Sequence, residues 1–134
     1  NQNPYSECDV KSLIDEGGFL ARRRTGGGAV YHDLGNLNFS FVADKEIYDV
    51  KRQMTVIQKA LLNYGLETEV SGRNDITYQG RKFSGNAFAK TKHQGLHHGT
   101  ILIKTDGEKL QRYLKVKPAK LHKHGVKSVA YQPK

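Results

Sequence analysis

Residues 22–41 read RRRTGGGAVYHDLGNLNFSF, and this stretch decides the fold class. Within it, residues 37–42 alternate apolar and polar side chains, which predicts a β-strand with its apolar set on one face of a sheet. Ahead of that strand, Gly26, Gly27 and Gly28 follow one another. Because glycine has no Cβ, a ligand can approach the backbone here, and the flanking arginines can bind a phosphate or carboxylate with paired donors. The alternative interpretation is a glycine bulge with solvated arginines.

Upstream of this stretch, the chain is predicted to begin with a turn-like segment and a short helix. The turn-like segment covers residues 1–6, and the helix covers residues 10–18, ending at Gly17, where glycine suits a left-handed cap. Residues 19–23 are predicted to be a strand. The three glycines interrupt it, and extended character resumes at residues 29–32.

Downstream, the clearest helix is predicted over residues 45–64. Asp44 is its expected N-cap, and Gly65 stands where a C-terminal glycine belongs. Apolar residues recur at spacings of three and four and form one stripe, made of Ile47, Val50, Met54, Ile57 and Leu61. The stripe indicates core packing, and we assign no chemistry to this helix.

The rest of the chain is mostly strand. Further strands are predicted at residues 66–70, 75–79, 82–90 and 100–104. The second and third of these flank Gly80-Arg81 as a β-hairpin. Residues 108–114 are predicted to be a short helix, and Pro118 begins an irregular basic tail. Strands outnumber helices and pair through short turns, so we expect one α+β domain over residues 1–134, with a mixed, largely antiparallel sheet and flanking helices.

The chain is strongly basic. Its 134 residues include 22 Lys and Arg against 13 Asp and Glu, a formal net charge of +9. Such an excess attracts anions, which could be nucleic acid, acidic lipid, a phosphorylated small molecule or an acidic protein. No apolar run reaches the roughly 18 residues of a membrane span, and the polar start does not resemble a signal peptide. We therefore expect a cytoplasmic protein.

Thiolate metal sites and disulfides are excluded by the cysteine count. Cys8 is the one cysteine, so it has no partner for an internal disulfide. His97 and His98 are adjacent, just before a predicted strand. Neighbouring side chains of an extended chain point to opposite faces, so the two rings are not expected to bind the same metal ion. A structural role is the expectation for these histidines.

Two further polar clusters could carry chemistry. Residues 32–36 read HDLGN, which could bind a metal or a nucleotide, although many tight turns have the same composition. The other cluster joins residues 73–75 to residues 80–86. There Lys82 stands in a hairpin between small residues, from which it could project into a cleft and stabilise charge developing on a phosphate or carbonyl oxygen. A solvated surface lysine is the alternative.

Taken together and in this order, these segments resemble the lipoate–protein ligase A family. The matching segments are NQNP at 1–4 with Glu7, residues 22–41, GRND at 72–75, GRKFSGNA at 80–87 and HHGTIL at 97–102. That family shares its fold with biotin–protein ligases and with lipoyl or octanoyl transferases. The resemblance implies activation of lipoate by ATP, with magnesium, to lipoyl-AMP, followed by transfer of the lipoyl group to a lysine of an acceptor protein.

The resemblance also implies roles for particular residues. Lys82 is the expected catalytic residue, in contact with the lipoyl carbonyl and the adenylate phosphate. Asp75 is the expected contact for magnesium. The expected lipoyl- and adenylate-binding residues are Arg23, Thr25, Gly26, Gly27, Gly28, Val30, Tyr31, His32, Asn36, Asn74, Asp75, Ser84, Gly85 and His98.

The expected partners follow from the same resemblance. The acceptors would be acidic lipoyl domains of 2-oxoacid dehydrogenase subunits or the glycine cleavage H protein, and a basic enzyme would gain encounter rate with them. No membrane is expected, and nucleic acid is not the favoured partner. The family's catalytic domain has further strands before Asn1, and bacterial ligases usually carry an accessory domain, so the chain is expected to be incomplete at both ends.

Two alternatives stay open. An ATP-independent lipoyl or octanoyl transferase commonly acts through a cysteine nucleophile, but Cys8 lies outside the motif region expected for that nucleophile. A basic nucleic-acid-binding module would bind with an affinity that falls steeply with salt, although no recognised binding motif is present.

Overall fold

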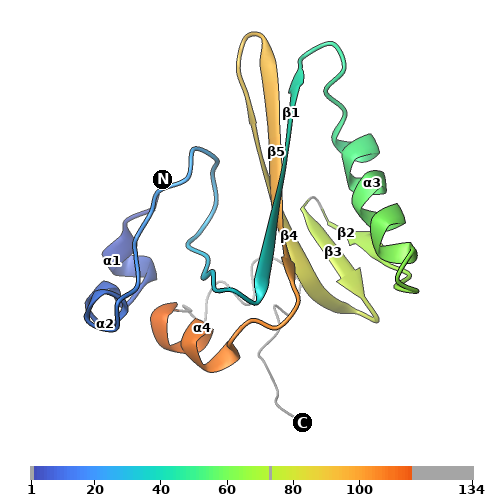
Figure 1. Cartoon of the computed structure of the whole chain (residues 1–134). Coiled ribbons are helices and arrows are strands. Elements are labelled where there is room, and N and C mark those ends of the chain that lie inside the picture. Colours follow the sequence, from blue (N-terminus) through green and yellow to red (C-terminus); the bar gives the residue numbers. More distant parts are fainter. Residues whose placement is uncertain (1, 73, 116–134) are drawn as a thin grey trace. The chain divides into compact units, whose positions relative to one another are not determined.

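A computed structural model describes residues 2–72 and 74–115 (Figure 1). The chain divides into two compact units. Unit 1 is Asn1–Gly35 with Lys104–Lys134, and unit 2 is Asn36–Ile103. The basic tail predicted from Pro118 lies outside the described residues. The single domain predicted over residues 1–134 stays a prediction.

Unit 2 contains a five-stranded sheet in the order β1-β5-β4-β3-β2 (Figure 1). Its strands are β1 (Asn36–Asp44), β2 (Glu69–Ser71), β3 (Asp75–Tyr78), β4 (Arg81–Lys90) and β5 (Gln94–Leu102). Every pairing between these strands is antiparallel. With the helices described below, this confirms the predicted α+β class.

The predicted hairpin between β3 and β4 forms, with its turn at Gln79-Gly80, one residue earlier than predicted. Gln79 and Gly80 both have positive φ, 50° and 73°. Two consecutive residues of this kind are what a type I′ turn requires, and its twist matches that of the strands.

Strand β5 begins at Gln94, six residues before the predicted start at residue 100. Gly95 and Gly99 resemble strand breakers, but both lie inside the strand. A Cβ on Gly95 would lie 2.3 Å from the Tyr48 ring, and one on Gly99 would lie 2.3 Å from Asn86 Oδ1. The glycines are therefore needed for close approach of neighbouring side chains, not for turning the chain.

Helix α3 (Val50–Leu62) is shorter at its start than predicted. The N-cap is Asp49, which accepts the Arg52 N–H, whereas Asp44 is the last residue of β1. The helix also ends at Leu62, two residues before the predicted end, whereas Gly65 has the positive φ expected of a C-terminal glycine, 75°. The core of unit 2 gathers around this helix and contains Met54, Ile57 and Ile76, with Phe39, Phe41, Val50, Leu61, Phe83, Phe88 and Ile101 packed against them.

The described part of unit 1 contains three short helices, α1 (Pro4–Glu7), α2 (Val10–Asp15) and α4 (Gly107–Tyr113). Each begins at a polar N-cap, Asn3, Asp9 and Asp106 respectively, whose side chain accepts a backbone N–H of the first turn. The prediction of a turn-like segment at residues 1–6 was wrong for residues 2–6, because Asn3 and the proline after it start α1 instead.

The strand predicted at residues 19–23 does not form. Phe19 is 93% exposed and Leu20 is 45% exposed, so the apolar residues of this segment find no buried face among the described residues. Residues 29–32 likewise carry no strand. The whole segment is irregular chain, which is how loops that bind ligands are usually built.

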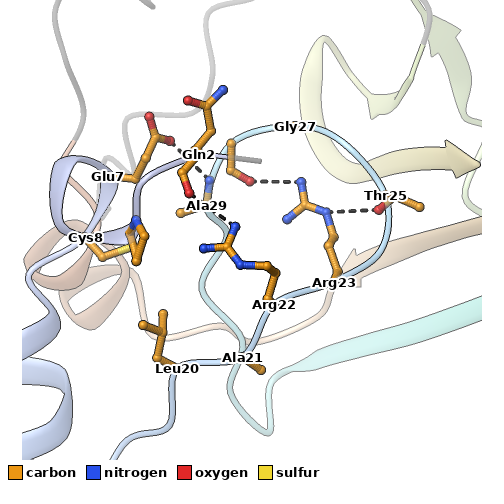
Figure 2. A pocket seen from close by; sticks show the side chains of 12 residues that line it. Gln2, Glu7, Cys8, Leu20, Ala21, Arg22, Arg23, Thr25, Gly27 and Ala29 are labelled. Carbon is orange, nitrogen blue, oxygen red and sulfur yellow. Dashed lines mark hydrogen bonds between the residues drawn. The ribbon is translucent and has the colours of Figure 1, made fainter.

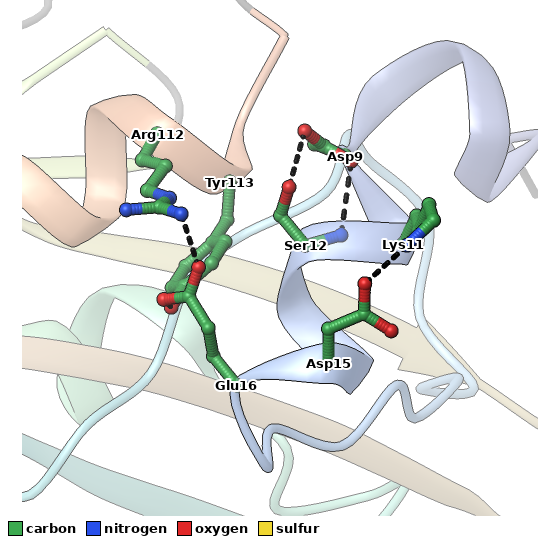
Figure 3. A network of polar contacts seen from close by, with 7 residues as sticks. All are labelled: Asp9, Lys11, Ser12, Asp15, Glu16, Arg112 and Tyr113. Atoms are coloured by element: carbon green, nitrogen blue, oxygen red, sulfur yellow. Dashed lines mark hydrogen bonds and ion pairs between the residues drawn. The ribbon is translucent and has the colours of Figure 1, made fainter.

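Side-chain contacts join α2 to α4 within unit 1 (Figure 3). The Glu16 carboxylate, just beyond α2, accepts the Tyr113 hydroxyl and pairs with Arg112. This hydrogen bond raises the pKa of Tyr113, because it favours the protonated phenol. An isolated backbone bridge between Cys8 and Leu114 adds a second link.

Among the described residues, no helix is long and apolar enough to cross a bilayer.

Candidate active site

A pocket of about 300 Å³ lies in unit 1 beside the glycine loop (Figure 2). This volume is at the lower end of the range typical for small-molecule sites. Its lining residues are Gln2, Pro4, Glu7, Cys8, Leu20, Ala21, Arg22, Arg23, Thr25, Gly27, Gly28 and Ala29. It therefore brings together the predicted site residues Arg23, Thr25, Gly27 and Gly28.

Arg23 shapes the glycine loop. Its Nε donates to Thr25 Oγ1 at 3.1 Å, and its Nη2 donates to the Gly28 carbonyl at 2.9 Å (Figure 2). The same Nη2 also donates to the Gly26 carbonyl at 2.9 Å. Gly27 has a φ of 113°, and a Cβ there would lie 2.6 Å from Nη2. The loop is thus folded around its own arginine, and Arg23 also lines the pocket, where its positive charge can attract an anion.

Helix α1 supplies another wall of the pocket. The Glu7 side chain accepts the Ala29 N–H at 3.2 Å, while its carbonyl accepts the Lys115 N–H at 2.8 Å. Arg22 Nη1 donates to the Gln2 carbonyl at 3.3 Å. Glu7 was part of the predicted resemblance, but the place of Arg22 in the pocket was not foreseen, since consecutive arginines carry no signal that separates them.

Cys8 lines the pocket but is only 6% exposed. Burial raises its pKa above the ordinary value, and the neighbouring Glu7 carboxylate acts in the same direction. The thiol is therefore held in its protonated form, which is the less nucleophilic one. This argues against a transferase that would use Cys8 as its nucleophile.

The HDLGN cluster is mainly a turn. Asp33 accepts the Gly35 N–H at 2.8 Å and the Asp106 N–H at 2.7 Å, so its carboxylate fastens the loop to the start of α4. Desolvation and the Arg23 guanidinium lower the pKa of His32 below its ordinary value. A neutral imidazole near Arg23 is consistent with the predicted role of His32 in binding.

Val30 and Tyr31 were predicted among the lipoyl- and adenylate-binding residues, and neither lines the pocket of unit 1. Val30 is 53% exposed. The Tyr31 ring lies against the Tyr113 ring, with centroids 5.6 Å apart. The sequence of residues 29–32 predicted extended chain but could not indicate the partner of each side chain.

Lys82 is held in a defined position in unit 2. Its Nζ lies 2.7 Å from Asp75 Oδ1 on the neighbouring strand β3. Between them the register shifts, so that Phe83 is an extra residue on β4 and the strand forms a β-bulge. A Cβ on Gly85 would lie 3.5 Å from Lys82 Nζ, so the lysine side chain extends along β4 past this glycine.

The segment ahead of Asp75 is fixed by Asn86. The Asn74 carbonyl accepts the Asn86 backbone N–H at 2.8 Å and the Asn86 Nδ2 at 2.9 Å. The predicted residues Asp75, Lys82 and Gly85 therefore lie together on β3 and β4, and Asn74 directly precedes β3. Asn86 was absent from the predicted site, although the quoted GRKFSGNA motif contains it.

Three other predicted residues of unit 2 have different surroundings. Ser84 has no exposed surface, and its hydroxyl accepts from Asn86 Nδ2 at 3.3 Å, which argues against a direct contact of this side chain with substrate. His98 is half-buried on the face of β5 opposite to the fully buried His97, as strand alternation predicted. Asn36 begins β1, where its side chain donates to Asn38 Oδ1.

The described residues fit a magnesium ion that is bound together with a nucleotide, and they do not fit a magnesium site made of protein ligands alone. Within residues 2–72 and 74–115, no three His, Cys, Asp or Glu side chains gather as metal ligands. Mg²⁺ is commonly held by one or two carboxylates together with water and substrate phosphates. Asp75, as one carboxylate already paired with Lys82, fits that arrangement and does not fit a dedicated metal cage.

Residues 1–133 match the model of the lipoyl protein ligase A/B catalytic domain, so the chain belongs to this family. It is similar to the lipoate-protein ligase A of Psychrobacter cryohalolentis, 45% identical over 129 residues, and to that of Bdellovibrio bacteriovorus, 47% identical over 133 residues. Each match covers 96% of this chain but only 38% and 39% of the relatives, respectively. The chain thus spans about two fifths of their length.

Solved structures agree with this assignment. LipL1 of P. falciparum in complex with lipoate has a TM-score of 0.80 at 45% identity, over 87% of this chain and 35% of that one. An archaeal bi-partite lipoate protein ligase, solved with its E2 lipoyl domain from Thermoplasma acidophilum, gives 0.75 at 36%, over 90% and 49%. A lipoate-protein ligase A bound with ATP gives 0.73 at 35%, over 87% and 53%. The predicted family and fold are confirmed.

Proposed function

We propose that this chain is the catalytic part of an ATP-dependent lipoate–protein ligase. The observation that carries the proposal is the placement of Lys82, which Asp75 holds beside Gly85 within the family's lysine motif. Family membership and the relatives solved with lipoate or with ATP support the choice of substrates.

The first step of the reaction makes a carboxylate into an acyl donor. A lipoate oxygen attacks the α-phosphate of ATP, pyrophosphate leaves, and lipoyl-AMP remains. The ammonium of Lys82 would stabilise the negative charge that develops on the phosphate, because a fixed cation needs no reorganisation during the reaction. The Arg23 guanidinium and the backbone around Gly26 to Gly28 would bind the acid or phosphate.

In the second step, the amine of an acceptor lysine attacks the lipoyl carbonyl of the mixed anhydride, and AMP leaves. Lys82 would then stabilise the oxyanion at that carbonyl. We assign Asn74 and Asp75 to the nucleotide, with Asp75 as the contact for a magnesium ion that neutralises phosphate charge. His32, Asn36 and His98 complete the proposed binding set, as do Val30 and Tyr31, which do not line the pocket of unit 1.

We propose acidic lipoyl domains as the acceptors. The T. acidophilum ligase solved with its E2 lipoyl domain supports a lipoyl domain as partner. The net charge of +9 supports an acidic one, since opposite charges raise the encounter rate. Lipoyl domains of 2-oxoacid dehydrogenase subunits and the glycine cleavage H protein are the proposed candidates.

Lipoate-dependent exchange of labelled pyrophosphate into ATP tests the first step. The complete protein should catalyse this exchange, and Lys82→Ala should reduce it by roughly 10²- to 10³-fold, the usual effect of removing one group that stabilises an oxyanion. Lys90→Ala is the matched control, because Lys90 ends the same strand and lies over the Tyr48 ring.

Other outcomes would replace the proposal. Acyl transfer from a carrier protein with no need for ATP would identify a transferase. Salt-sensitive binding of RNA or DNA, with neither activity, would identify a nucleic-acid-binding module.

A further inference from the structure

His97 is the most deeply buried titratable side chain described in unit 2, with no exposed surface. Three aromatic rings pack around its imidazole, those of Phe39, Phe41 and Phe88. A polar ring in apolar surroundings is costly unless its nitrogens find partners. Nδ1 lies 3.0 Å from Gln53 Oε1 on α3, and Nε2 lies 2.9 Å from Asn86 Oδ1 on β4.

The Asn86 carboxamide has its orientation fixed by the groups on its other side. Its Nδ2 donates to the Asn74 carbonyl at 2.9 Å and to Ser84 Oγ at 3.3 Å. Its oxygen must therefore face His97, and Nε2 of that ring carries the proton that it accepts. Burial lowers the pKa of His97 to about 4, so the ring is neutral near pH 7. With the proton on Nε2, Nδ1 is an acceptor, and the Gln53 carboxamide donates to it when its nitrogen rather than its oxygen faces the ring.

Gly99 leaves the space that this arrangement needs. It stands opposite Asn86 in the register of β4 and β5. A Cβ at this position would lie 2.3 Å from Asn86 Oδ1 and 2.5 Å from the Phe39 ring. The glycine of the HHGT segment is thus accounted for by the side chain that bonds His97.

We propose that His97 is a positioning residue, which acts through Asn86 to fix the Asn74 carbonyl and the segment that presents Asn74 and Asp75 to the nucleotide. The contacts run without a break from α3 through His97 and Asn86 to Asn74, and the next residue, Asp75, pairs with Lys82. Among the described residues, the side-chain hydrogen bonds and ring contacts of His97 go to Gln53, Asn86 and three phenylalanines, none of which we assign to a substrate. The inference rests on the proposed roles of Asn74 and Asp75.

Kinetics of the complete protein test the specific role of His97. His97→Phe keeps an aromatic ring among the phenylalanines and removes both polar contacts. In the pyrophosphate exchange assay it should raise the KM for ATP by roughly tenfold or more, because small displacements of binding groups have effects of this size. The KM for lipoate should rise less than the KM for ATP, since Arg23 and the glycine loop, which we assign to the bound acid, belong to unit 1.

Two further variants separate positioning from general damage. His97→Gln can still donate to Asn86 Oδ1 and should recover part of the ATP affinity. His93→Phe, on the exposed turn between β4 and β5, should behave as wild type. An unchanged KM for ATP in His97→Phe, or an equal loss for both substrates, would overturn the inference.

Amide NMR spectra without substrates give a readout that is independent of the reaction. His97→Phe should shift the Asn86 side-chain amide and the Asn74 and Asp75 backbone amides, while His93→Phe should not. If His97→Phe does not fold, Asn86→Ser repeats the test, since it keeps the backbone bond to Asn74 and loses the carboxamide. The inference is overturned if the Asn74 and Asp75 resonances do not move. If they move in a protein that has no exchange activity, the positioning role of His97 is supported and the proposed reaction is rejected.

Discussion

Lys82 and Asp75 face each other across the β3–β4 hairpin, with 2.7 Å between Nζ and Oδ1. The lysine side chain is 34% exposed and the aspartate side chain 15% exposed. An ion pair that is partly solvated contributes at most about 1 kcal/mol to the free energy of unfolding. Its consequence is therefore mainly geometric: the carboxylate fixes the direction of the one ammonium to which we assign catalysis.

Replacing this carboxylate should impair the enzyme more than it impairs the fold. We expect Asp75→Asn to raise the Mg²⁺ concentration that half-saturates pyrophosphate exchange by about tenfold or more, since ligand and supporting residues of metal sites have effects of this size. The midpoint of thermal unfolding should change little. Asp44→Asn, at the exposed end of β1, is the control. A normal Mg²⁺ requirement in Asp75→Asn would remove Asp75 from the metal.

Adjacent glycines of the loop should respond differently to the same substitution. Gly27 has a φ of 113°, a region that side chains rarely adopt, and a Cβ there would lie 2.6 Å from Arg23 Nη2. The strain of such a backbone costs roughly 1–3 kcal/mol. Gly27→Ala should therefore lower the unfolding temperature and weaken lipoate binding.

Gly26→Ala is the matched control for this prediction, because a Cβ at Gly26 has no atom within 4 Å. It should unfold at the temperature of the wild type. Calorimetry of unfolding and titration with lipoate measure the two effects. Equal unfolding temperatures for the two variants would contradict the conformation described for the loop.

The buried imidazole of His97 should make stability depend on pH. Its folded pKa is about 4, lowered mainly by burial and also by His98, from an ordinary value of 6.5. Below pH 6.5 the unfolded chain binds a proton that the folded chain does not. The contribution of this group is therefore complete above pH 6.5, declines as the pH falls toward 4, and amounts to about 3 kcal/mol in all.

Denaturant unfolding between about pH 7 and about pH 4 measures this decline. The variant His97→Phe has no such group and should lose the corresponding part of the pH dependence, whereas His93→Phe should retain it. In NMR titration, the ring signals of His97 should stay constant from about pH 7 to about pH 5, because its folded pKa is about 4. A His97 ring that titrates near its ordinary pKa would contradict the buried, neutral state.

Sequence periodicity predicted most of unit 2 but not the ends of its elements. The stripe of α3 and the alternation of β1 are signals of one element packing on another, and both elements formed. Asp44 and Asp49 are equally good N-caps by composition, and only the length of β1 decides between them. Likewise, Gly95 and Gly99 carry no mark that distinguishes close approach from a turn.

Only those residues of the candidate site that belong to a recognisable sequence motif could be predicted. Lys82 and the three glycines stand in conspicuous local sequences, whereas Gln53 looks like any polar residue of an amphipathic helix. Its contact with His97 joins residues 44 positions apart, which no local pattern encodes. The pairing of Arg23 with its own loop was also hidden, because a sequence does not distinguish an arginine that binds a ligand from one that binds backbone carbonyls.

The hydroxyl of Thr25 should be the feature that matters at this position. Thr25 is 5% exposed, and its Oγ1 accepts from Arg23 Nε at 3.1 Å. Thr25→Val has nearly the same shape but leaves this guanidinium nitrogen without its acceptor, which costs about 1–3 kcal/mol for a buried group. Thr25→Ser keeps the acceptor and loses only a methyl group.

We expect Thr25→Val to lower both the unfolding temperature and the affinity for lipoate. Thr25→Ser should preserve the affinity within about threefold, because its remaining loss is one of packing. Isothermal titration with lipoate measures the difference, and equal affinities for the two variants would show that Arg23 is oriented without Thr25.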